Sequence, residues 1–235
     1  MKIGYYCAAL GTREQAKRLE VISNNIANTN TAGFKKDTVL FRDFMVETSS
    51  PRMQQGSMRT TDNPLNIALM GDGFLKVQTD QGVMYTRNGD LRLSSDGTVT
   101  TQEGWPVLSK NGPIRLTSSK VRISEDGQIF DINEDPTAAA SKESIATIDL
   151  VSFPAKTPMT KAGNGYFTPA DATAAPLPTT TCTVHQGALE QANFNVVEEM
   201  TQMIDTLRTY ESYQKVLQSF DQIDSQLSTK LANPQ

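Results

Sequence analysis

The chain has 235 residues, of which 37% are hydrophobic and 20% are charged, and its formal net charge is −4. This length allows one or two domains with a real hydrophobic core, while the low apolar content indicates a thin core and much polar surface. The acidic balance argues against non-specific nucleic-acid binding, and the lack of an apolar run of about 18 residues argues against a membrane span.

The residue types that bind metals or form disulfides are scarce. The chain has two cysteines, Cys7 and Cys182, and one histidine, His185. Two isolated cysteines do not make a disulfide framework, and a single histidine excludes a site with two histidine ligands within one chain. We therefore expect no metal or other cofactor, no small-molecule substrate and no catalytic residue. The N-terminus also lacks the long apolar stretch and the cleavage site of a secretory signal peptide.

Residues 1–34 are predicted to form an N-terminal helix. Apolar and small residues recur there at alternating spacings of four and three, which is typical of a weak coiled-coil seam. These residues are Tyr5, Ala9, Thr12, Ala16, Leu19, Ser23 and Ile26. Four asparagines then favour caps and turns, because their side chains bond to nearby backbone groups. They are Asn24, Asn25, Asn28 and Asn30. Gly33 adopts positive φ angles without steric cost, and Phe34 supplies an apolar anchor directly after the turn.

Residues 35–64 form a predicted connecting segment, and residues 65–181 form a predicted central β domain. Short apolar stretches alternate in this domain with residue pairs that supply the positive φ angles of tight hairpin turns. These pairs are Asp72-Gly73, Asn88-Gly89, Asp96-Gly97, Asn111-Gly112 and Asp126-Gly127. Their spacing indicates an all-β meander or a barrel-like sandwich. The clearest predicted hairpin spans residues 94–100, with Leu93 on one arm and Val99 on the other.

Residues 182–192 are predicted to return the chain to a C-terminal helix, which spans residues 193–235 and pairs with residues 1–34. Large apolar residues recur in this helix at steps of three or four. They are Met200, Met203, Leu207, Tyr210, Tyr213, Leu217, Phe220, Ile223, Leu227 and Leu231. Asn195 is the predicted N-cap, with Glu198 three residues later as in a capping box. The predicted fold class is therefore α+β, with the N- and C-terminal helices forming a coiled-coil-like domain around a central all-β domain.

The two terminal segments carry opposite charges. Residues 1–36 contain six basic and two acidic residues, whereas residues 186–235 contain three basic and seven acidic residues. Opposite charges favour pairing, but they do not distinguish pairing within one chain from pairing between neighbours. The apolar face of the C-terminal helix is wider than the narrow first helix can cover, and each large apolar side chain contributes roughly 1.5–3 kcal/mol when fully buried. We therefore expect the excess to be buried by neighbouring copies.

The residues alone leave two other classes of function open. Cys182 and His185 lie three residues apart, a spacing at which a turn brings together the nucleophile and base of a Cys-dependent hydrolase. A small apolar cysteine beside a polar histidine at the end of a strand is the simpler interpretation. The third class is a secreted adhesin or coiled-coil binding module, which would bind a foreign ligand as a defined oligomer.

Two segments combine asparagine, glycine and apolar residues in a specific order. The first is Ser23-Asn24-Asn25-Ile26-Ala27-Asn28 with Thr31, Gly33, Phe34 and Lys35. The second is Gly187-Ala188-Leu189-Glu190 with Asn193, Asn195, Val196, Glu199, Met200, Met203 and Ile204. Between them lie Pro64-Leu65-Asn66-Ile67-Ala68, Gly71-Asp72-Gly73-Phe74, Tyr85-Thr86-Arg87-Asn88-Gly89 and Gly112-Pro113-Ile114. Together these motifs resemble the signature segments of bacterial flagellar axial proteins, the rod and hook family.

The resemblance implies a structural subunit of the flagellar basal-body rod without enzymatic activity, most like the proximal-rod type, with the distal-rod and hook types as alternatives. Such subunits polymerise into the hollow helical drive shaft of bacterial motility, which transmits torque and passes exported subunits. The implied partners are copies of itself, other axial rod proteins and the flagellar type III export apparatus. The implied location is the periplasmic rod, reached without a cleavable signal peptide. The residues implied in assembly or the family motif are Asn24, Asn25, Ala27, Asn28, Gly33, Phe34, Asn193, Asn195, Met200, Met203, Leu207, Tyr210 and Leu217.

Overall fold

The computed structural model describes residues 2–42, 45–132, 144–154, 157–171, 174–179 and 181–232. The chain divides into two compact units. One unit contains Met1–Ala27, Asp37–Ser50 and Phe194–Gln235, and the other contains Asn28–Lys36 and Pro51–Asn193. Each unit therefore combines segments that are far apart in the sequence.

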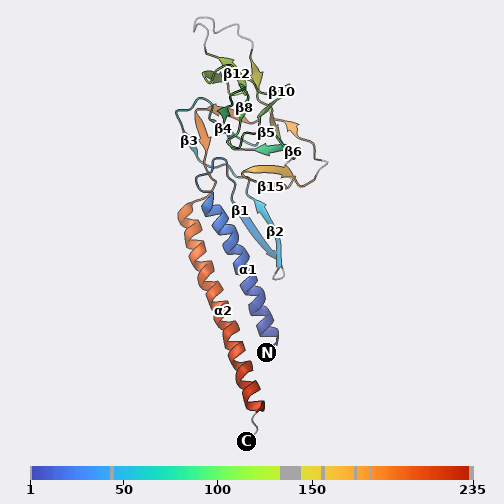
Figure 1. Cartoon of the computed structure of the whole chain (residues 1–235), viewed down its shortest axis with the longest axis vertical. Coiled ribbons are helices and arrows are strands. Elements are labelled where there is room, and N and C mark those ends of the chain that lie inside the picture. The colour runs from blue at the N-terminus through green and yellow to red at the C-terminus, as the bar shows by residue number, and fades with distance from the viewer. Residues whose placement is uncertain are drawn as a thin grey trace. The chain divides into compact units, whose positions relative to one another are not determined.

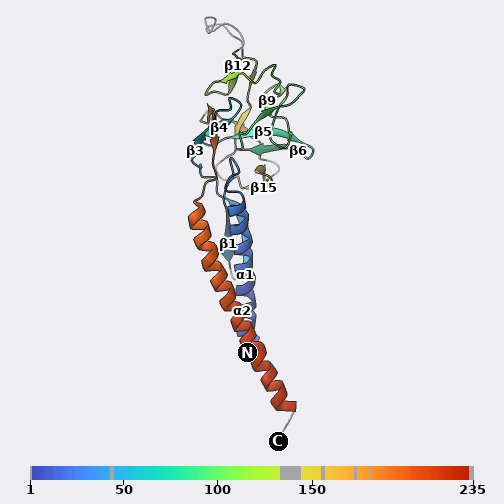
Figure 2. The same ribbon diagram turned by 60° about the vertical axis from the view of Figure 1, so that its left-hand side comes forward.

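Two helices form most of the first unit. The helices α1 (Lys2–Ala27) and α2 (Val196–Ala232) lie side by side in opposite directions, and α2 continues beyond the first residue of α1 (Figure 1, Figure 2). The strands β1 (Asp37–Arg42) and β2 (Met45–Pro51) form a two-stranded sheet, and β1 contacts α1. The predicted helices at the two ends of the chain are confirmed. No helix in the described part of the chain is long and apolar enough to cross a membrane.

The start of α2 is fixed by Asn195. Its side-chain Oδ1 accepts a hydrogen bond of 3.0 Å from the backbone N–H of Val197, and its backbone carbonyl accepts one of 3.1 Å from Glu199. The first bond satisfies a backbone donor that has no partner within the helix. Glu198 and Glu199 place negative charge in the first turn, where the helix dipole is positive. Asn195 is therefore the N-cap, as predicted.

The second unit is rich in short β-strands. In chain order these are β3 (Met58–Thr60), β4 (Ile67–Met70), β5 (Phe74–Thr79), β6 (Gly82–Thr86), β7 (Arg92–Leu93), β8 (Val99–Thr100), β9 (Leu108–Ser109), β10 (Gly112–Pro113), β11 (Val121–Ile123), β12 (Gln128–Asp131), β13 (Ala146–Thr147), β14 (Leu150–Ser152), β15 (Met159–Gly163), β16 (Tyr166–Pro169), β17 (Leu177–Pro178), β18 (Thr183–Gln186) and β19 (Ala188–Glu190). The predicted central β-rich domain is thus confirmed.

The predicted barrel-like closure is not found. The largest sheet has six strands in the order β15-β16-β6-β5-β14-β17, so its two edge strands do not pair with each other. A three-stranded sheet (β11-β12-β13) and the two-stranded pairs β10-β9, β18-β4, β19-β3 and β7-β8 complete the described strands, and none of these sheets closes into a barrel. Many strands span only two or three residues. Turns interrupt the ladder too often for a continuous sheet to curl back on itself.

Three of the five predicted turn pairs form hairpins. Asp96-Gly97 lies between β7 and β8, with Leu93 paired to Val99 as predicted. Asn111-Gly112 and Asp126-Gly127 connect β9 to β10 and β11 to β12. The glycines of these three pairs all have positive φ angles. Asn88-Gly89 instead serves close packing, because a Cβ on Gly89 would lie 1.8 Å from the backbone oxygen of Ile67.

The main hydrophobic core of the second unit lies among these small sheets. Its fully buried members come from β4, β5 and β11 and from the loops after β8 and β10, and include Ile67, Leu69, Leu75, Val107, Ile114 and Val121. A second, aromatic cluster packs Phe74, Tyr85 and Phe167 together with Val151 and Met159. Strands from distant parts of the sequence contribute to both clusters, so the second unit depends on long-range contacts.

Candidate assembly surfaces and a buried ionic cluster

Two glycines of α1 receive aromatic rings from α2. A Cβ atom on Gly4 would lie 3.0 Å from Cζ of Phe220, and a Cβ on Gly11 would lie 2.7 Å from Cζ of Tyr213. The ring of Tyr5 also packs edge-on against that of Phe220, with centroids 6.4 Å apart. The close approach of α2 to α1 therefore depends on the missing side chains of Gly4 and Gly11.

The face of α1 that meets α2 carries the inner seam, which lies one residue away from the seam predicted from the sequence. The inner seam consists of Gly4, Ala8, Gly11, Gln15, Ile22 and Asn25, which lie on one face and, apart from Gly4, are buried. Every member directly precedes a residue of the predicted seam, which is therefore turned about 100° away. Tyr5, Ala16 and Ser23 are exposed, and Ala9, Thr12, Leu19 and Ile26 are only half-buried. The prediction was wrong because it looked for apolar residues, whereas this face uses glycine, glutamine and asparagine.

The matching inner seam of α2 follows the same alternation of three and four residues. Glu199 and Thr206 are buried, and the half-buried members are Met203, Tyr210, Tyr213, Leu217 and Phe220. The pairing of Gly4 with Phe220 and Gly11 with Tyr213 advances seven residues on each helix, in opposite directions. This regular matching is what an extended helix-to-helix contact requires.

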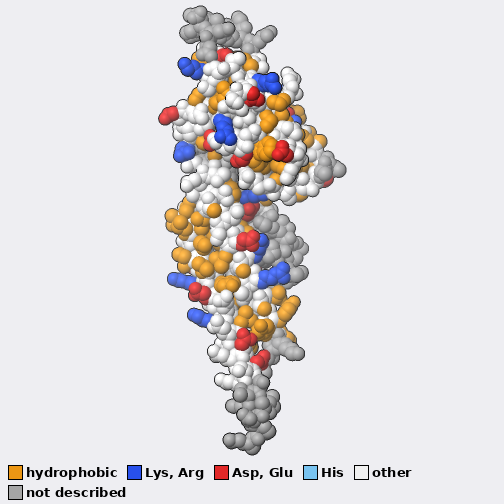
Figure 3. Space-filling model, viewed as in Figure 1, with side chains coloured by type: hydrophobic (Ala, Val, Ile, Leu, Met, Phe, Trp, Pro, Cys, Tyr) orange, Lys and Arg blue, Asp and Glu red, His pale blue; other side chains and the backbone are white. Residues whose placement is uncertain are grey.

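A second apolar stripe on α2 lies beside the inner seam and is turned about 100° from it. This outer stripe consists of Val197, Met200, Ile204 and Leu207, whose exposed fractions are 70%, 49%, 51% and 40%. Their spacing of three, four and three residues places them on one side of the helix. Figure 3 shows hydrophobic side chains gathered over the N-terminal half of α2. The apolar face of α2 is therefore wider than the surface that α1 covers.

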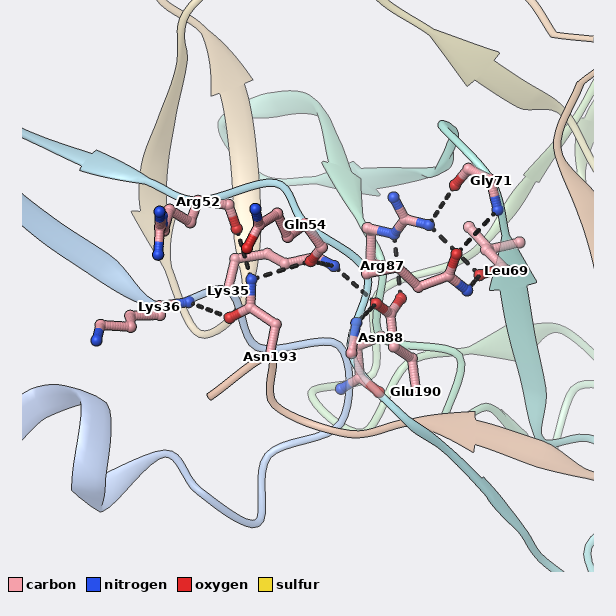
Figure 4. Close-up of polar contacts among 12 residues, drawn as sticks. Lys35, Lys36, Arg52, Gln54, Leu69, Gly71, Arg87, Asn88, Glu190 and Asn193 are labelled. Carbon is pink, nitrogen blue, oxygen red and sulfur yellow. Dashed lines mark hydrogen bonds and ion pairs between the residues drawn. The ribbon is translucent and has the colours of Figure 1, made fainter. Parts of the chain in front are cut away.

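In the second unit, three charged residues from distant segments form a buried ionic cluster (Figure 4). Lys35 Nζ lies 2.7 Å from Oε1 of Glu190, and Arg87 Nε lies 3.1 Å from Oε2 of the same carboxylate. The side chains of Lys35 and Glu190 are fully buried, and that of Arg87 is 2% exposed. Burial lowers the pKa of Lys35, and the Glu190 carboxylate opposes this shift. Two cations thus share one buried anion.

Backbone groups complete the ionic cluster. Lys35 Nζ donates to the carbonyl of Gln54 at 2.8 Å, and Glu190 Oε1 accepts from the N–H of Gly56 at 2.8 Å. The Arg87 guanidinium donates to the carbonyl of Gly71 at 2.6 Å. Each charge therefore has several partners, which a buried ion requires if it is not to destabilise the fold.

The side-chain amide of Asn193 joins the same chain segments beside the ionic cluster. Its Oδ1 accepts from the backbone N–H of Lys36 at 2.7 Å. Its Nδ2 donates to the carbonyls of Arg52 and Gln54 at 2.7 and 2.9 Å (Figure 4). Together with Glu190, it connects the chain after α1, the segment before β3 and the chain before α2.

The residues that the sequence assigned to assembly or to the family motif are distributed over four places. On the inner seam lie Asn25, Met203, Tyr210 and Leu217, and on the outer stripe lie Met200 and Leu207. Beside the ionic cluster lie Gly33, Phe34 and Asn193. The others are at helix ends: Asn24 and Ala27 are exposed in the last turn of α1, Asn28 is half-buried just after it, and Asn195 caps α2. Arg87, Glu190, Glu199 and Ile204 belong to the motifs quoted from the sequence, but sequence reasoning gave them no contact, and it did not single out Val197. Arg87, Glu190 and Glu199 bond to residues far away along the chain, which leaves no local signal. Val197 and Ile204 are exposed on α2.

The proposed nucleophile and base are not arranged for catalysis. Cys182 and Val184 both belong to the main core, and side chains alternate along a strand, so His185 faces the other way. Cys182 is only 4% exposed, and burial raises the pKa of its thiol. Such a thiol is a poor nucleophile. In the described part of the chain, no cluster of three or more His, Cys, Asp or Glu residues could hold a metal ion.

The two cysteines are expected to react differently with iodoacetamide. In the folded protein at mildly alkaline pH, Cys7 should be alkylated first, because it is exposed, whereas Cys182 should react only after unfolding. Mass spectrometry of peptides after timed alkylation measures both rates in one sample. If Cys182 in the folded protein were alkylated as fast as Cys7, its thiol would be accessible and reactive, and the argument against a Cys-dependent hydrolase would fail.

Three family descriptions match separate parts of the chain. Residues 6–35 match the flagella basal body rod protein family, residues 68–135 match the flagellar hook protein FlgE/F/G D1 domain, and residues 185–230 match the C-terminal region of flagellar basal body rod FlgEFG proteins. The first and third matches contain the two signature segments noted in the sequence.

Curated relatives match almost the whole chain. It is 32% identical to the flagellar basal-body rod protein FlgF of Escherichia coli (strain K12), over 91% of this chain and 92% of the relative. It is 30% identical to FlgF of Caulobacter vibrioides, over 86% of each chain, and 28% identical to FlgG of Bacillus subtilis, over 94% and 96%. These matches confirm the predicted structural, non-enzymatic rod protein and give no support to a hydrolase. The chain belongs to the flagellar basal-body rod protein family.

Proposed function

We propose that this rod subunit assembles by burying the outer stripe of α2 against a neighbouring copy. The observation that carries the proposal is the exposure of four large apolar side chains on one side of α2. Full burial of such a side chain contributes roughly 1.5–3 kcal/mol, and these four are 40–70% exposed. A contact that covers the stripe therefore has several kcal/mol available to offset the cost of association.

The partner surface that we propose is the side of α1 that is turned about 100° from the inner seam, in the neighbouring copy. This side carries Tyr5, Ala9, Thr12, Ala16 and Leu19, whose regular spacing resembles that of the outer stripe. Residues 1–36 are basic overall and residues 186–235 are acidic, which favours pairing of the two surfaces. Because the two surfaces differ, the contact is heterologous, and repetition builds an open filament instead of a closed dimer.

Replacing Ile204 by aspartate is expected to weaken this assembly at least about tenfold. The change removes apolar contact and puts a charge into the interface, and about 1.4 kcal/mol corresponds to a factor of ten. Ile204 is 51% exposed, so the helices of the single subunit should keep their thermal stability. Sedimentation of purified protein measures assembly, and swimming of a strain carrying the variant measures rod function.

Thr209→Asp is the matched control. Thr209 is exposed on α2 and lies outside both the outer stripe and the inner seam, so the same change of charge should leave assembly intact. Equal assembly of the Ile204→Asp and Thr209→Asp variants would contradict the proposal. Binding of a foreign ligand by a closed oligomer would instead favour the adhesin or binding-module class.

The remaining features of the function rest on the family. We propose that the terminal segments, residues 1–34 and 193–235, pair as a coiled-coil-like domain and that residues 65–181 form a separate β domain joined through residues 35–64 and 182–192. We further propose a place in the periplasmic, proximal part of the rod, reached through the flagellar export apparatus without a cleavable signal. There the polymer transmits torque and leaves a channel for exported subunits. The resemblance of the signature segments supports these assignments.

A further inference from the structure

A buried polar pair interrupts the inner seam near the C-terminal end of α1. Asn25 Nδ2 donates to Oε2 of Glu199 at 3.3 Å, and both residues are only 1% exposed. The Asn25 amide also pairs with the backbone of Asp37, donating to its carbonyl at 3.1 Å and accepting from its N–H at 3.0 Å. Asn25 is thus held in position and presents a donor to the Glu199 carboxylate.

The other specific contacts of the inner seam do not fix one alignment of the helices. Gly4 and Gly11 receive Phe220 and Tyr213, and each pair is seven residues apart on its helix. If α2 slipped by seven residues, one of the two rings would still meet a glycine. The aromatic contacts are therefore compatible with several alignments of α2 along α1 that differ by seven residues, and they do not select one of these alignments.

Asn25 and Glu199 distinguish these alignments, because each slip separates them. In one slipped alignment Asn25 would face Thr206 and Glu199 would pass beyond the last turn of α1. In the other, Glu199 would face Arg18 and Asn25 would pass beyond the start of α2. The buried Asn25 amide loses the Glu199 carboxylate in both slips, and the carboxylate loses its amide donor in both; only in the second does Arg18 offset the loss at Glu199. Apolar contacts, by contrast, tolerate exchange. Single buried polar residues select the alignment of helices in this way in coiled coils.

We propose that the Asn25–Glu199 pair fixes the alignment of the two terminal helices, and we call this pair the register lock. The contacts of Gly4 and Gly11 with the aromatic rings let the helices approach closely but do not fix their alignment. The lock has a consequence for the surface of the subunit. A slip of seven residues moves α2 about 10 Å along α1, and the outer stripe moves with it. The register lock is a property of a single chain, so it holds or fails independently of the assembly proposed above.

Distances between two spin labels test the register lock in the full-length monomer. One label is attached to the native, exposed Cys7 and the other to a cysteine at the exposed position Gln202, in a Cys182→Ala background. Dilution with unlabelled chain removes distances between copies. The parent protein should give one distance population. The double variant Asn25→Leu/Glu199→Leu should give a second population shifted by about 10 Å, with unchanged helix content by circular dichroism.

Two further variants make the result specific. The exposed neighbours Asn24 and Glu198, changed to leucine together, should leave one population, because neither lies on the inner seam. Glu199→Gln should also keep one population, since its amide oxygen still accepts from Asn25. A single, unshifted population in Asn25→Leu/Glu199→Leu would overturn the proposal, as would two populations in Glu199→Gln. If the leucine pair fails to fold, Asn25→Ala, which removes the donor to Glu199 without adding bulk, should give the shifted population instead, and a single unshifted population there would overturn the proposal.

Discussion

Replacing Glu190 by alanine is expected to lower the free energy of unfolding of the strand-rich unit by about 3–5 kcal/mol. The carboxylate lies 2.7 Å from Lys35 Nζ and 3.1 Å from Arg87 Nε, with all three side chains buried. Its loss leaves two cations in the interior without an anion and also removes the acceptor for the N–H of Gly56. Since the free energy of unfolding of a domain is typically only about 5–15 kcal/mol, this change removes a large part of it. Urea unfolding followed by circular dichroism measures the effect.

An ion pair near the surface of the same unit provides the control. Lys76 Nζ and Asp149 Oδ2 lie 2.8 Å apart, with side chains that are 24% and 15% exposed. Water screens part of that interaction, so Asp149→Ala should cost about 1 kcal/mol or less. If Glu190→Ala cost no more than Asp149→Ala, the ionic cluster would not have the stabilising role assigned to it.

The cost of Glu190→Ala should also depend on pH in a defined direction. Burial lowers the pKa of Lys35, and Glu190 is the largest influence that raises it. Without Glu190, the folded-state pKa of Lys35 falls further below its unfolded value. Between these two values the unfolded chain binds the additional proton, so stability rises with pH in that window. The deficit of the variant relative to the parent protein should therefore shrink as pH increases.

The sequence predicted those parts of the molecule that local patterns determine. Helical periodicity located both terminal helices, Asn195 identified the start of α2, and Asp96-Gly97 identified a hairpin. Each of these depends on residues within a few positions of one another. The inner seam of α1 was misplaced by one residue because Gly4 and Gly11 have no apolar side chain to reveal a contact face. Their role is evident only from the rings that α2 places over them.

The ionic cluster shows why other features could not be predicted. Lys35 and Glu190 are 155 residues apart, and Arg87 and Glu190 are 103 apart, so no spacing in the sequence indicates that they meet. Both Lys35 and Glu190 belong to the motifs that resemble the rod and hook family. Because both side chains are buried in one ion pair, the presence of Lys35 and Glu190 in the motifs is explained by the stability of a single chain. The signature segments therefore contain residues that hold one subunit together, in addition to any that contact its neighbours.

Gly33→Ala is expected to destabilise the strand-rich unit by more than about 3 kcal/mol, through backbone conformation and steric overlap together. Gly33 has a φ angle of 68°. An alanine residue in this left-handed backbone conformation raises the free energy of the folded state by roughly 1–2 kcal/mol. A Cβ there would lie 2.5 Å from the carbonyl carbon of Arg87, so the backbone must shift. That shift would break the 2.7 Å hydrogen bond from the Gly33 N–H to the Glu190 carbonyl and displace Lys35, two residues later. The midpoint of urea unfolding measures the loss.

Gly165→Ala separates the two contributions, because Gly165 has a similar φ angle of 78° and no atom within 4 Å of an added Cβ. It should show the conformational cost alone, roughly 1–2 kcal/mol. The difference between the two variants then measures the overlap at Arg87 and its effect on the ionic cluster. If that overlap acts through Lys35, Gly33→Ala combined with Glu190→Ala should cost less than the sum of the separate changes, since both disrupt the same cluster. Strict additivity of the two changes would show that the turn at Gly33 and the ionic cluster are independent.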